Sequence, residues 1–417
     1  MGVNAPAELY APAFEFGSEP TPLIELADWF NGLAFKNIDF SSEGLPVVKI
    51  AEIKNGLSET TKRTQATYDP KVRLNDGDLL FCWSGQPETS IGTCIWSQGE
   101  AWLNQHIFRV VAKEGVDQNF LHFLMLYLQP NFQAIAANKQ TTGLGHVTKR
   151  DLGDMLVQIP TLDEQLRVVE VLQPIQERIA LSSRMAATLE ETAQALFRSW
   201  FIDFDPVHAK MESRETDLPA NIADLFPDQL SDQGFPVGWQ RQTLRDVLTL
   251  NYGKSLPAAK RVAGAVPVYG SGGISGFHNE PLVQEPTIIV GRKGTVGKIF
   301  WESSPSFPID TAFFVTPKPN VGLEFLWYQL AIFDLKSMNT DAAVPGLNRD
   351  NAYSLELLLP SSSLMEVFID LASSVRLKLN ELNESKMILE ALRNNLLPLL
   401  ISGQLRIPEV EEAVAAA

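Results

Sequence analysis

The chain has 417 residues, and at the usual domain size of about 100–200 residues this length predicts two or three domains. Its hydrophobic content of 45%, against 20% charged residues, excludes a disordered or fibrous protein, and no apolar run approaches the roughly 20 residues of a membrane span. The net charge of −16 argues against a nucleic-acid partner unless the basic residues are concentrated locally.

Three strands are predicted first, at residues 78–83, 92–96 and 106–111, where β-branched and aromatic residues lie between glycines and prolines. A short apolar helix is expected over 120–128. From Val168 to Trp200, apolar or small residues then recur with alternating spacings of four and three. This spacing predicts a long amphipathic helix over 163–199, and its apolar stripe needs a partner.

The segment 203–238 has a different composition. It contains four prolines, and the overlapping stretch 201–232 holds eight acidic residues against two basic ones. We expect a linker without helices or strands here. Beyond it, strands are predicted at 287–290, 297–301 and 312–316, a short helix at 323–333 and a second long helix at 364–400.

The two halves of the chain follow the same order, and identical residues recur at a nearly constant offset. At a shift of 205 residues Phe108 matches Phe313, and Gly92 and Trp96 have identical matches at the same shift. A repeat of this length predicts a duplicated domain. Each long helix of 37 residues would extend about 55 Å at ~1.5 Å per residue.

We therefore predict an α+β fold with two β-rich domains, related by the internal repeat and joined and separated by two long antiparallel helices. The alternative is that each helix lies in a core of its own. The predicted boundaries are 1–160 for the first domain, 161–202 for the first long helix, 203–238 for the acidic linker, 239–360 for the second domain, 361–405 for the second long helix and 406–417 for a tail.

No catalytic or metal-binding pattern is present. The glycine-rich stretch 270–276 lacks the spacing of a dinucleotide fingerprint, and residues 291–295 lack the four residues that a P-loop places between its glycines. The five histidines match no zinc-enzyme pattern, and Cys82 and Cys94 match no metal spacing, which indicates a protein of the reducing cytoplasm. We expect no catalytic residue, no metal and no cofactor in this chain.

Basic residues are concentrated in two windows. Residues 49–73 hold six basic side chains against three acidic ones, and residues 252–300 hold six against two. Such windows are most often solvated faces, and the alternative is that they bind nucleic acid. Arg292 and Lys293 lie between two glycines, as expected of a basic turn at a sheet rim that binds a phosphate.

At several motifs the sequence resembles the specificity (S) subunit of type I restriction-modification systems, over essentially the whole chain. Residues 160–165 (Pro-Thr-Leu-Asp-Glu-Gln) resemble the start of the family's central helix, 196–207 its end, and 402–405 the end of the distal helix. Residues 267–274 with 291–294 resemble one class of the family's target recognition domains. One departure is that the second repeat has no Glu-Gln pair after Pro360.

The resemblance implies a non-catalytic subunit with two target recognition domains, each recognising one half of a split site on double-stranded DNA. It also implies two methyltransferase (M) subunits, which hold S-adenosylmethionine, and restriction (R) subunits in the full complex. The paired helices would then set the number of base pairs between the half-sites. Partner contacts are expected at Glu164, Gln165, Phe197, Trp200 and Phe201.

DNA contacts are predicted where the basic windows meet turns and loops. In the first domain the candidates are Lys54, Lys62, Arg63, Trp83, Ser84, Gln86 and His146. In the second domain they are Lys254, Lys260, Arg261, Tyr269, Ser271, Arg292, Lys293, Lys298, Asn348 and Arg349. We expect Arg292 to bind a guanine edge and Lys293 a phosphate, and the alternative is that both are solvated turn residues.

Two other functions stay open at this point. A helical scaffold could assemble partners without contacting DNA, which would make the basic windows dispensable. An enzyme with a glycine-rich phosphate-binding loop would be active as the isolated chain. For the predicted specificity subunit, we expect helix faces that include Ile388 and Leu392 to stay exposed without M subunits.

Overall fold

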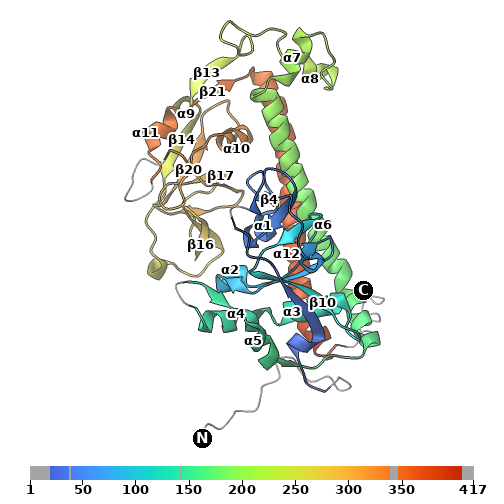
Figure 1. Cartoon of the computed structure of the whole chain (residues 1–417). Helices are drawn as coiled ribbons and strands as arrows, with labels where there is room; N and C mark the ends of the chain where they lie inside the picture. The colour runs from blue at the N-terminus through green and yellow to red at the C-terminus, as the bar shows by residue number, and fades with distance from the viewer. Residues whose placement is uncertain (1–18, 37–38, 141–142, 339–345, 406–417) are drawn as a thin grey trace, which may run out of the picture. The chain divides into compact units, whose positions relative to one another are not determined.

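The computed structural model describes residues 19–36, 39–140, 143–338 and 346–405 (Figure 1). The expected tail at 406–417 lies outside the described residues. The chain divides into two compact units. The first unit comprises Met1–Leu181 with Ser385–Ala417, and the second unit comprises Ser182–Glu384. Each unit therefore contains one globular portion and one half of each long helix.

The first unit is built on an antiparallel sheet in the order β2-β10-β6-β8. These strands span Ala27–Asn31 (β2), Ile107–Ala112 (β10), Leu79–Cys82 (β6) and Gly92–Ile95 (β8). All four residues of β6 are buried: Leu79 and Phe81 belong to one apolar cluster, while Leu80 and Cys82 belong to another. A continuous apolar run such as β6 is what a strand buried on both faces requires.

Shorter elements complete the first unit. A second sheet has the order β4-β3-β9-β5, with strands at Arg63–Thr64, Leu45–Val48, Ala101–Leu103 and Arg73–Leu74. Two further pairs join β1 (Thr21–Pro22) to β12 (Leu156–Val157) and β7 (Ser84–Gly85) to β11 (Gly145–His146). The helices are α1 (Ile50–Asn55), α2 (Pro87–Ser90), α3 (Gln118–Tyr127), α4 (Gln129–Asn138) and α5 (Lys149–Asp154).

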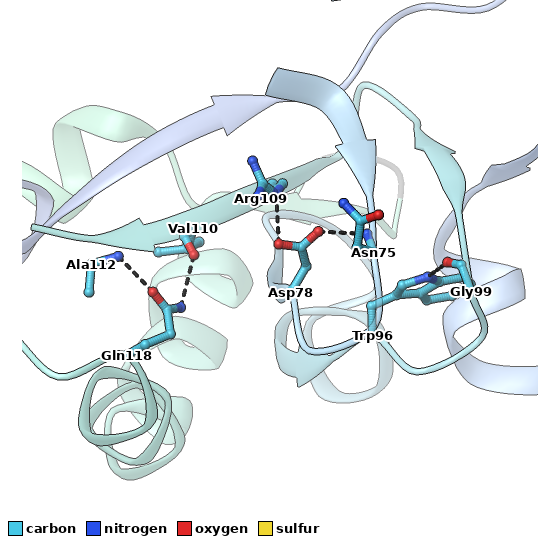
Figure 2. A network of polar contacts seen from close by, with 8 residues as sticks. All are labelled: Asn75, Asp78, Trp96, Gly99, Arg109, Val110, Ala112 and Gln118. Atoms are coloured by element: carbon cyan, nitrogen blue, oxygen red, sulfur yellow. Dashed lines mark hydrogen bonds and ion pairs between the residues drawn. The ribbon is translucent and has the colours of Figure 1, made fainter. Parts of the chain in front are cut away.

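Side-chain hydrogen bonds hold strand β10 to the segments on either side of it (Figure 2). Arg109 on β10 donates from Nε to Asp78 Oδ1 at 2.8 Å, just before β6. Gln118, at the start of α3, donates to the Val110 carbonyl at 3.0 Å and accepts from the Ala112 amide at 2.8 Å. These contacts satisfy buried backbone groups at the end of β10, and they fix where α3 begins.

The second unit repeats this plan. Its main sheet has the order β14-β20-β17-β18, with strands at Leu248–Tyr252, Ala312–Pro317, Thr287–Gly291 and Ile299–Glu302, followed by α10 (Leu323–Ile332). Phe108 on β10 pairs with Asn31, and its repeat match Phe313 on β20 pairs with Tyr252. The two sheets therefore correspond strand for strand, and the predicted repeat is confirmed.

The remaining elements of the second unit are short. A three-stranded sheet has the order β16-β15-β19, with strands at Gly273–His278, Val266–Gly270 and Phe307–Pro308. Strand β13 (Gln240–Thr243) pairs with β21 (Glu356–Leu359), and the short helices are α9 (Leu244–Val247) and α11 (Arg349–Tyr353). The glycine-rich stretch 270–276 spans the end of β15, the turn at 271–272 and the start of β16, so no helix follows it as a phosphate-binding loop would require.

The two long helices, α6 (Leu162–Phe201) and α12 (Ser362–Ile401), have 40 residues each. In the first unit Arg393 on α12 donates to Gln176 Oε1 on α6 at 2.8 Å. In the second unit the rings of Phe368 and Phe197 lie 5.4 Å apart. Early residues of α6 thus meet late residues of α12, and late residues meet early ones. The predicted antiparallel pairing is confirmed, and each half-pair also packs into the core of its unit.

The expectation of a linker without helices at 203–238 is wrong. Residues Asp205–Met211 form α7 and Ala220–Ala223 form α8. Val207 and Phe226 are buried in the same cluster as Trp200 at the end of α6. The acidic side chains dominate the composition of this segment, but the few apolar ones are enough to fold it onto the second unit's core.

Candidate nucleic-acid interface

In the first unit the structure gathers three of the predicted residues at the end of β6. Ser84 and His146 are register partners in the β7–β11 pair. The Trp83 ring stacks on Phe108 at 5.8 Å, and its Nε1 donates to Asn31 Oδ1 at 2.9 Å. Gln86 is exposed and occupies the N-cap position of α2 without a side-chain capping hydrogen bond. This arrangement is a half-exposed aromatic and polar surface.

The other predicted residues of the first unit lie on different elements. Lys54, on α1, donates to Ser90 Oγ at 3.1 Å. Lys62 is exposed, and Arg63 on β4 donates from Nη1 to the Gly44 carbonyl at 3.0 Å. Within the described residues, no hydrogen bond or ring contact joins any of these three to Trp83. They are basic positions outside the Trp83 surface.

In the second unit, four of the predicted residues donate backbone hydrogen bonds to the segment 308–312. The backbone amides of Arg292 and Lys293 both donate to the Thr311 carbonyl, at 2.9 and 3.1 Å. The Ser271 amide donates to Thr311 Oγ1 at 3.3 Å, and the Lys254 amide donates to the Pro308 carbonyl at 3.1 Å. Sequence reasoning missed this segment because it contains no basic residue.

The close approach of the turn after Gly291 to the Ser271 turn requires a glycine at position 291. A Cβ on Gly291 would lie 2.1 Å from the Thr295 carbonyl oxygen and 2.8 Å from the Ser271 carbonyl oxygen. No side chain fits at such distances, since both atoms belong to the backbone. The glycine therefore allows the turn that carries Arg292 and Lys293 to pack against the Ser271 turn.

Arg292 and Arg349 both lie close to the Tyr252 ring, which is at the end of β14. Each guanidinium carbon is 4.8 Å from the ring centroid. Arg292 also donates from Nη1 to the Asp310 carbonyl at 3.0 Å, and the backbone of Lys293 forms an isolated antiparallel β-bridge with Gly346. Asn348 caps α11 by accepting two backbone amides, which places Arg349 at the first position of that helix. Tyr252 carries no charge, so the sequence did not mark it.

The remaining predicted residues of the second unit lie away from the Tyr252 ring and differ in exposure. Lys260 is exposed, and the Arg261 guanidinium donates to the Ser275 carbonyl at 2.6 Å on β16. Lys298 lies 5.0 Å from the Phe300 ring centroid. Tyr269 was predicted as a DNA contact, but it is buried, and its hydroxyl donates to Glu302 Oε2 at 2.8 Å. Burial and the neighbouring carboxylate raise the pKa of Tyr269, so it stays a neutral core residue.

Ion pairing separates the candidate arginines from most others in the chain. Among the described residues, nine arginines pair with a carboxylate, including Arg73, Arg109 and Arg376. None of the four predicted DNA-binding arginines does; these are Arg63, Arg261, Arg292 and Arg349. Unneutralised guanidiniums on a chain of net charge −16 favour an anionic ligand at these positions.

Four of the five predicted partner contacts are buried within the chain, and Glu164 stays a prediction. Phe197, Trp200 and Phe201 fill the core of the second unit. Gln165 is buried in the first unit, where its amide donates to the Pro160 carbonyl at 2.9 Å. Glu164 is half-exposed and accepts from the Thr161 hydroxyl at 2.9 Å as part of the helix cap. The resemblance at the helix ends implied these contacts, but a motif match does not show whether a side chain faces the core or a partner.

Exposed apolar side chains do occur on other faces of the long helices. Ile388 is 68% exposed and Leu392 is 44% exposed, as the sequence predicted. Similar residues in the first unit are Leu162, Leu166, Leu181, Met387 and Leu399. Within the described residues, no helix is long and apolar enough to cross a membrane, and no group of three or more histidine, cysteine or acidic side chains is placed to bind a metal.

The described residues thus form two repeated sheet units with paired long helices and with basic and aromatic turn surfaces. The family model for the type I restriction modification DNA specificity domain matches residues 17–191 and 236–363. Since these segments cover well over half of the chain, the protein belongs to the family of type I restriction-modification specificity subunits.

Known proteins resemble the chain over most of its length. It is 24% identical to the HindI specificity subunit of Haemophilus influenzae over 358 residues, covering 68% of this chain and 77% of that protein. Identity to the MjaIX specificity subunit of Methanocaldococcus jannaschii is 22% over 346 residues, covering 77% and 76%. The crystal structure of the S subunit from M. genitalium has the same fold, with a TM-score of 0.53, 18% identity and coverage of 94% and 98%.

Proposed function

We propose that the chain recognises a bipartite site on double-stranded DNA, with one unit contacting each half-site. The observation that supports this most strongly is the set of unpaired basic side chains around the segment 308–312 and Tyr252. Arg292, Lys293 and Arg349 have no carboxylate partner among the described residues, although acidic residues outnumber basic ones in the chain. Phosphates and guanine edges are the acceptors that such groups bind.

The proposal extends to the partners expected of this family. Two M subunits that hold S-adenosylmethionine would dock on the chain, and R subunits would join the complex. The exposed face around Ile388 and Leu392 on α12 is the proposed docking surface for an M subunit, because apolar side chains this exposed favour a protein contact. Ile388→Glu should abolish co-purification with M subunits. Val237→Glu, which changes an exposed valine outside the long helices, should not.

DNA binding is tested with the full chain in complex with its M subunits. The complex should bind duplex DNA with an affinity that falls steeply as salt rises, because phosphate contacts release counterions. Changing both Arg292 and Lys293 to Gln should weaken binding. Arg150→Gln is the matched control, since Arg150 is exposed but already paired with Asp154 at 3.8 Å. If the double variant binds as the wild type does, the scaffold function is favoured instead.

The bipartite site itself is tested in the source cell. Deletion of the gene should remove methylation from a split DNA sequence, and complementation should restore it. Methylation that persists unchanged after deletion would contradict the proposal.

A further inference from the structure

Tyr252 has two cations close to its ring. Tyr252 is 47% exposed and is the last residue of the edge strand β14. The ring packs against Phe313 with centroids 5.0 Å apart, while Arg292 and Arg349 each lie 4.8 Å away. Two like charges around one ring repel each other, and within the described residues no carboxylate pairs with either one. The ring faces offset part of this repulsion by cation–π attraction.

The backbone fixes both arginines at this ring. The Arg292 amide and its Nη1 bind the carbonyls of Thr311 and Asp310. The Arg292 carbonyl in turn accepts from the Leu347 amide at 2.8 Å, two residues before Arg349. Arg349 also has a buried Nε with no hydrogen-bond partner. The guanidinium ends are therefore set in place while their hydrogen-bonding capacity is only partly used.

The first unit has the same arrangement with different side chains. By strand register and repeat offset, Asn31, Trp83 and Lys149 stand where the second unit has Tyr252, Arg292 and Arg349. The Val147 amide binds the Trp83 carbonyl at 2.8 Å, as Leu347 binds Arg292. Lys149 lies 5.4 Å from the Phe108 ring. The fold thus places a cation against an aromatic ring in both units, but only the second unit has two guanidiniums there.

We propose that Tyr252 is a positioning residue for a two-arginine site that binds a pair of acceptor atoms on DNA. The acceptors are either O6 and N7 of a guanine or oxygens of the phosphate backbone, both of which guanidinium groups recognise. This inference rests on the proposed function and adds to it a residue that positions DNA-binding groups. The Tyr252 ring holds the two guanidinium planes, and its hydroxyl is not required.

The test compares Tyr252→Phe with Tyr252→Leu in the full chain bound to its M subunits. The probe is a duplex containing the mapped methylation site, titrated over a range of salt concentrations. The Tyr252→Phe variant keeps the ring and should bind as the wild type does, whereas the Tyr252→Leu variant should lose about tenfold in affinity. Phe235→Leu is the matched control, since Arg241 lies 5.6 Å from that ring but is paired with Glu356.

Two further readouts identify the acceptors. If they are phosphate oxygens, Tyr252→Leu should lower the salt slope by about 0.9 per lost phosphate contact on every sequence. If they are a guanine edge, the loss should be confined to one G·C position, and 7-deazaguanine at that position should reproduce it. If Tyr252→Leu fails to fold, Arg349→Gln replaces it in this test. Arg349→Gln keeps the Tyr252 ring and should show the same pattern of loss.

Equal binding by Tyr252→Leu and wild type would overturn the inference, as would an equal loss in Tyr252→Phe and Tyr252→Leu. An additive effect of Tyr252→Leu and Arg349→Gln in the double variant would also overturn it, because a positioning residue must couple to the group it positions. If the wild-type complex does not bind DNA at all, the proposed function itself fails, and that outcome is distinct from the others.

Discussion

His122 is a buried titratable residue on α3 that the DNA-binding surfaces do not use. It is 3% exposed, and neither ring nitrogen has a hydrogen-bond partner. Burial lowers the pKa of His122 to about 4, and the nearby Arg393 on α12 contributes to this lowering. The imidazole is therefore neutral at pH 7, and protonating it would place a second positive charge beside Arg393 in the core of the first unit.

This residue predicts acid-sensitive stability in the first unit. The folded pKa lies below the unfolded value of 6.5, so the unfolded chain takes up the proton first. The contribution of His122 is fully present above pH 6.5 and is lost as the pH falls toward 4. At ~1.4 kcal/mol per pKa unit, the loss is on the order of 3 kcal/mol. Calorimetric melting at several pH values should show a shallower acid slope for His122→Phe. Equal slopes would contradict the prediction.

Arg292 and Lys293 are neighbours with separable roles. Arg292 is anchored at Asp310 and Tyr252, whereas the Lys293 side chain is exposed. We expect Arg292→Ala to relax one base position, costing about 1–3 kcal/mol, and Lys293→Ala to weaken all sequences alike. Affinities for a panel of single-base variants measure both effects. Changes below about 0.5 kcal/mol in both variants would mean that the two are ordinary solvated turn residues.

At the scale of elements, a polar network ties both long helices to the second unit's sheet. Glu190 on α6 accepts from Trp327 Nε1 on α10 at 2.8 Å and lies 3.8 Å from Arg376 on α12. The Arg376 guanidinium in turn lies 4.4 Å from the ring centroid of Trp301 on β18. The Arg376 side chain is only 14% exposed, so its charge depends on the Glu190 carboxylate more than on water.

Glu190→Gln should destabilise the second unit by about 2 kcal/mol. The amide keeps an acceptor for Trp327 but leaves the largely buried Arg376 charge unpaired. Asp163→Asn is the control, because its partner Arg167 forms an exposed i,i+4 pair worth at most about 0.5 kcal/mol. Denaturant unfolding monitored by tryptophan fluorescence measures the difference, and equal effects of the two substitutions would disprove the role of the network.

The elements with strong periodicity were predictable, while contacts between distant segments were not. The long helices follow from spacing, and three strands of each main sheet follow from their residue types; their observed ends differ by at most two residues from prediction. Strands β2 and β14 were not predicted. The linker prediction failed because composition hid Val207 and Phe226. In the site, the basic turn at Arg292 was visible as charge. Tyr252, Lys149 and the segment 308–312 were not, since only strand register and folding bring them to that turn.

At the scale of the whole molecule, both long helices continue from one unit into the other. The unit boundary falls after Leu181 in α6 and after Glu384 in α12. Inserting one heptad at each boundary lengthens both helices by about 10 Å at ~1.5 Å per residue, comparable to about three base pairs at ~3.4 Å per step. We expect the methylated site to gain spacer length with both half-sites unchanged. A variant that remains active with the original spacer would show that the helices do not set it.

The division of the chain also has a consequence for its biosynthesis. The second unit is contiguous, so a ribosome completes it once Glu384 has been made. The first unit is translated earlier but needs Leu397, Leu400 and Ile401 to close its core around Val168 and Leu172. Until then the apolar surface around Val168 and Leu172 is exposed in the nascent chain, which favours aggregation or chaperone binding. We therefore expect the first unit to complete its core only after the second unit is able to fold.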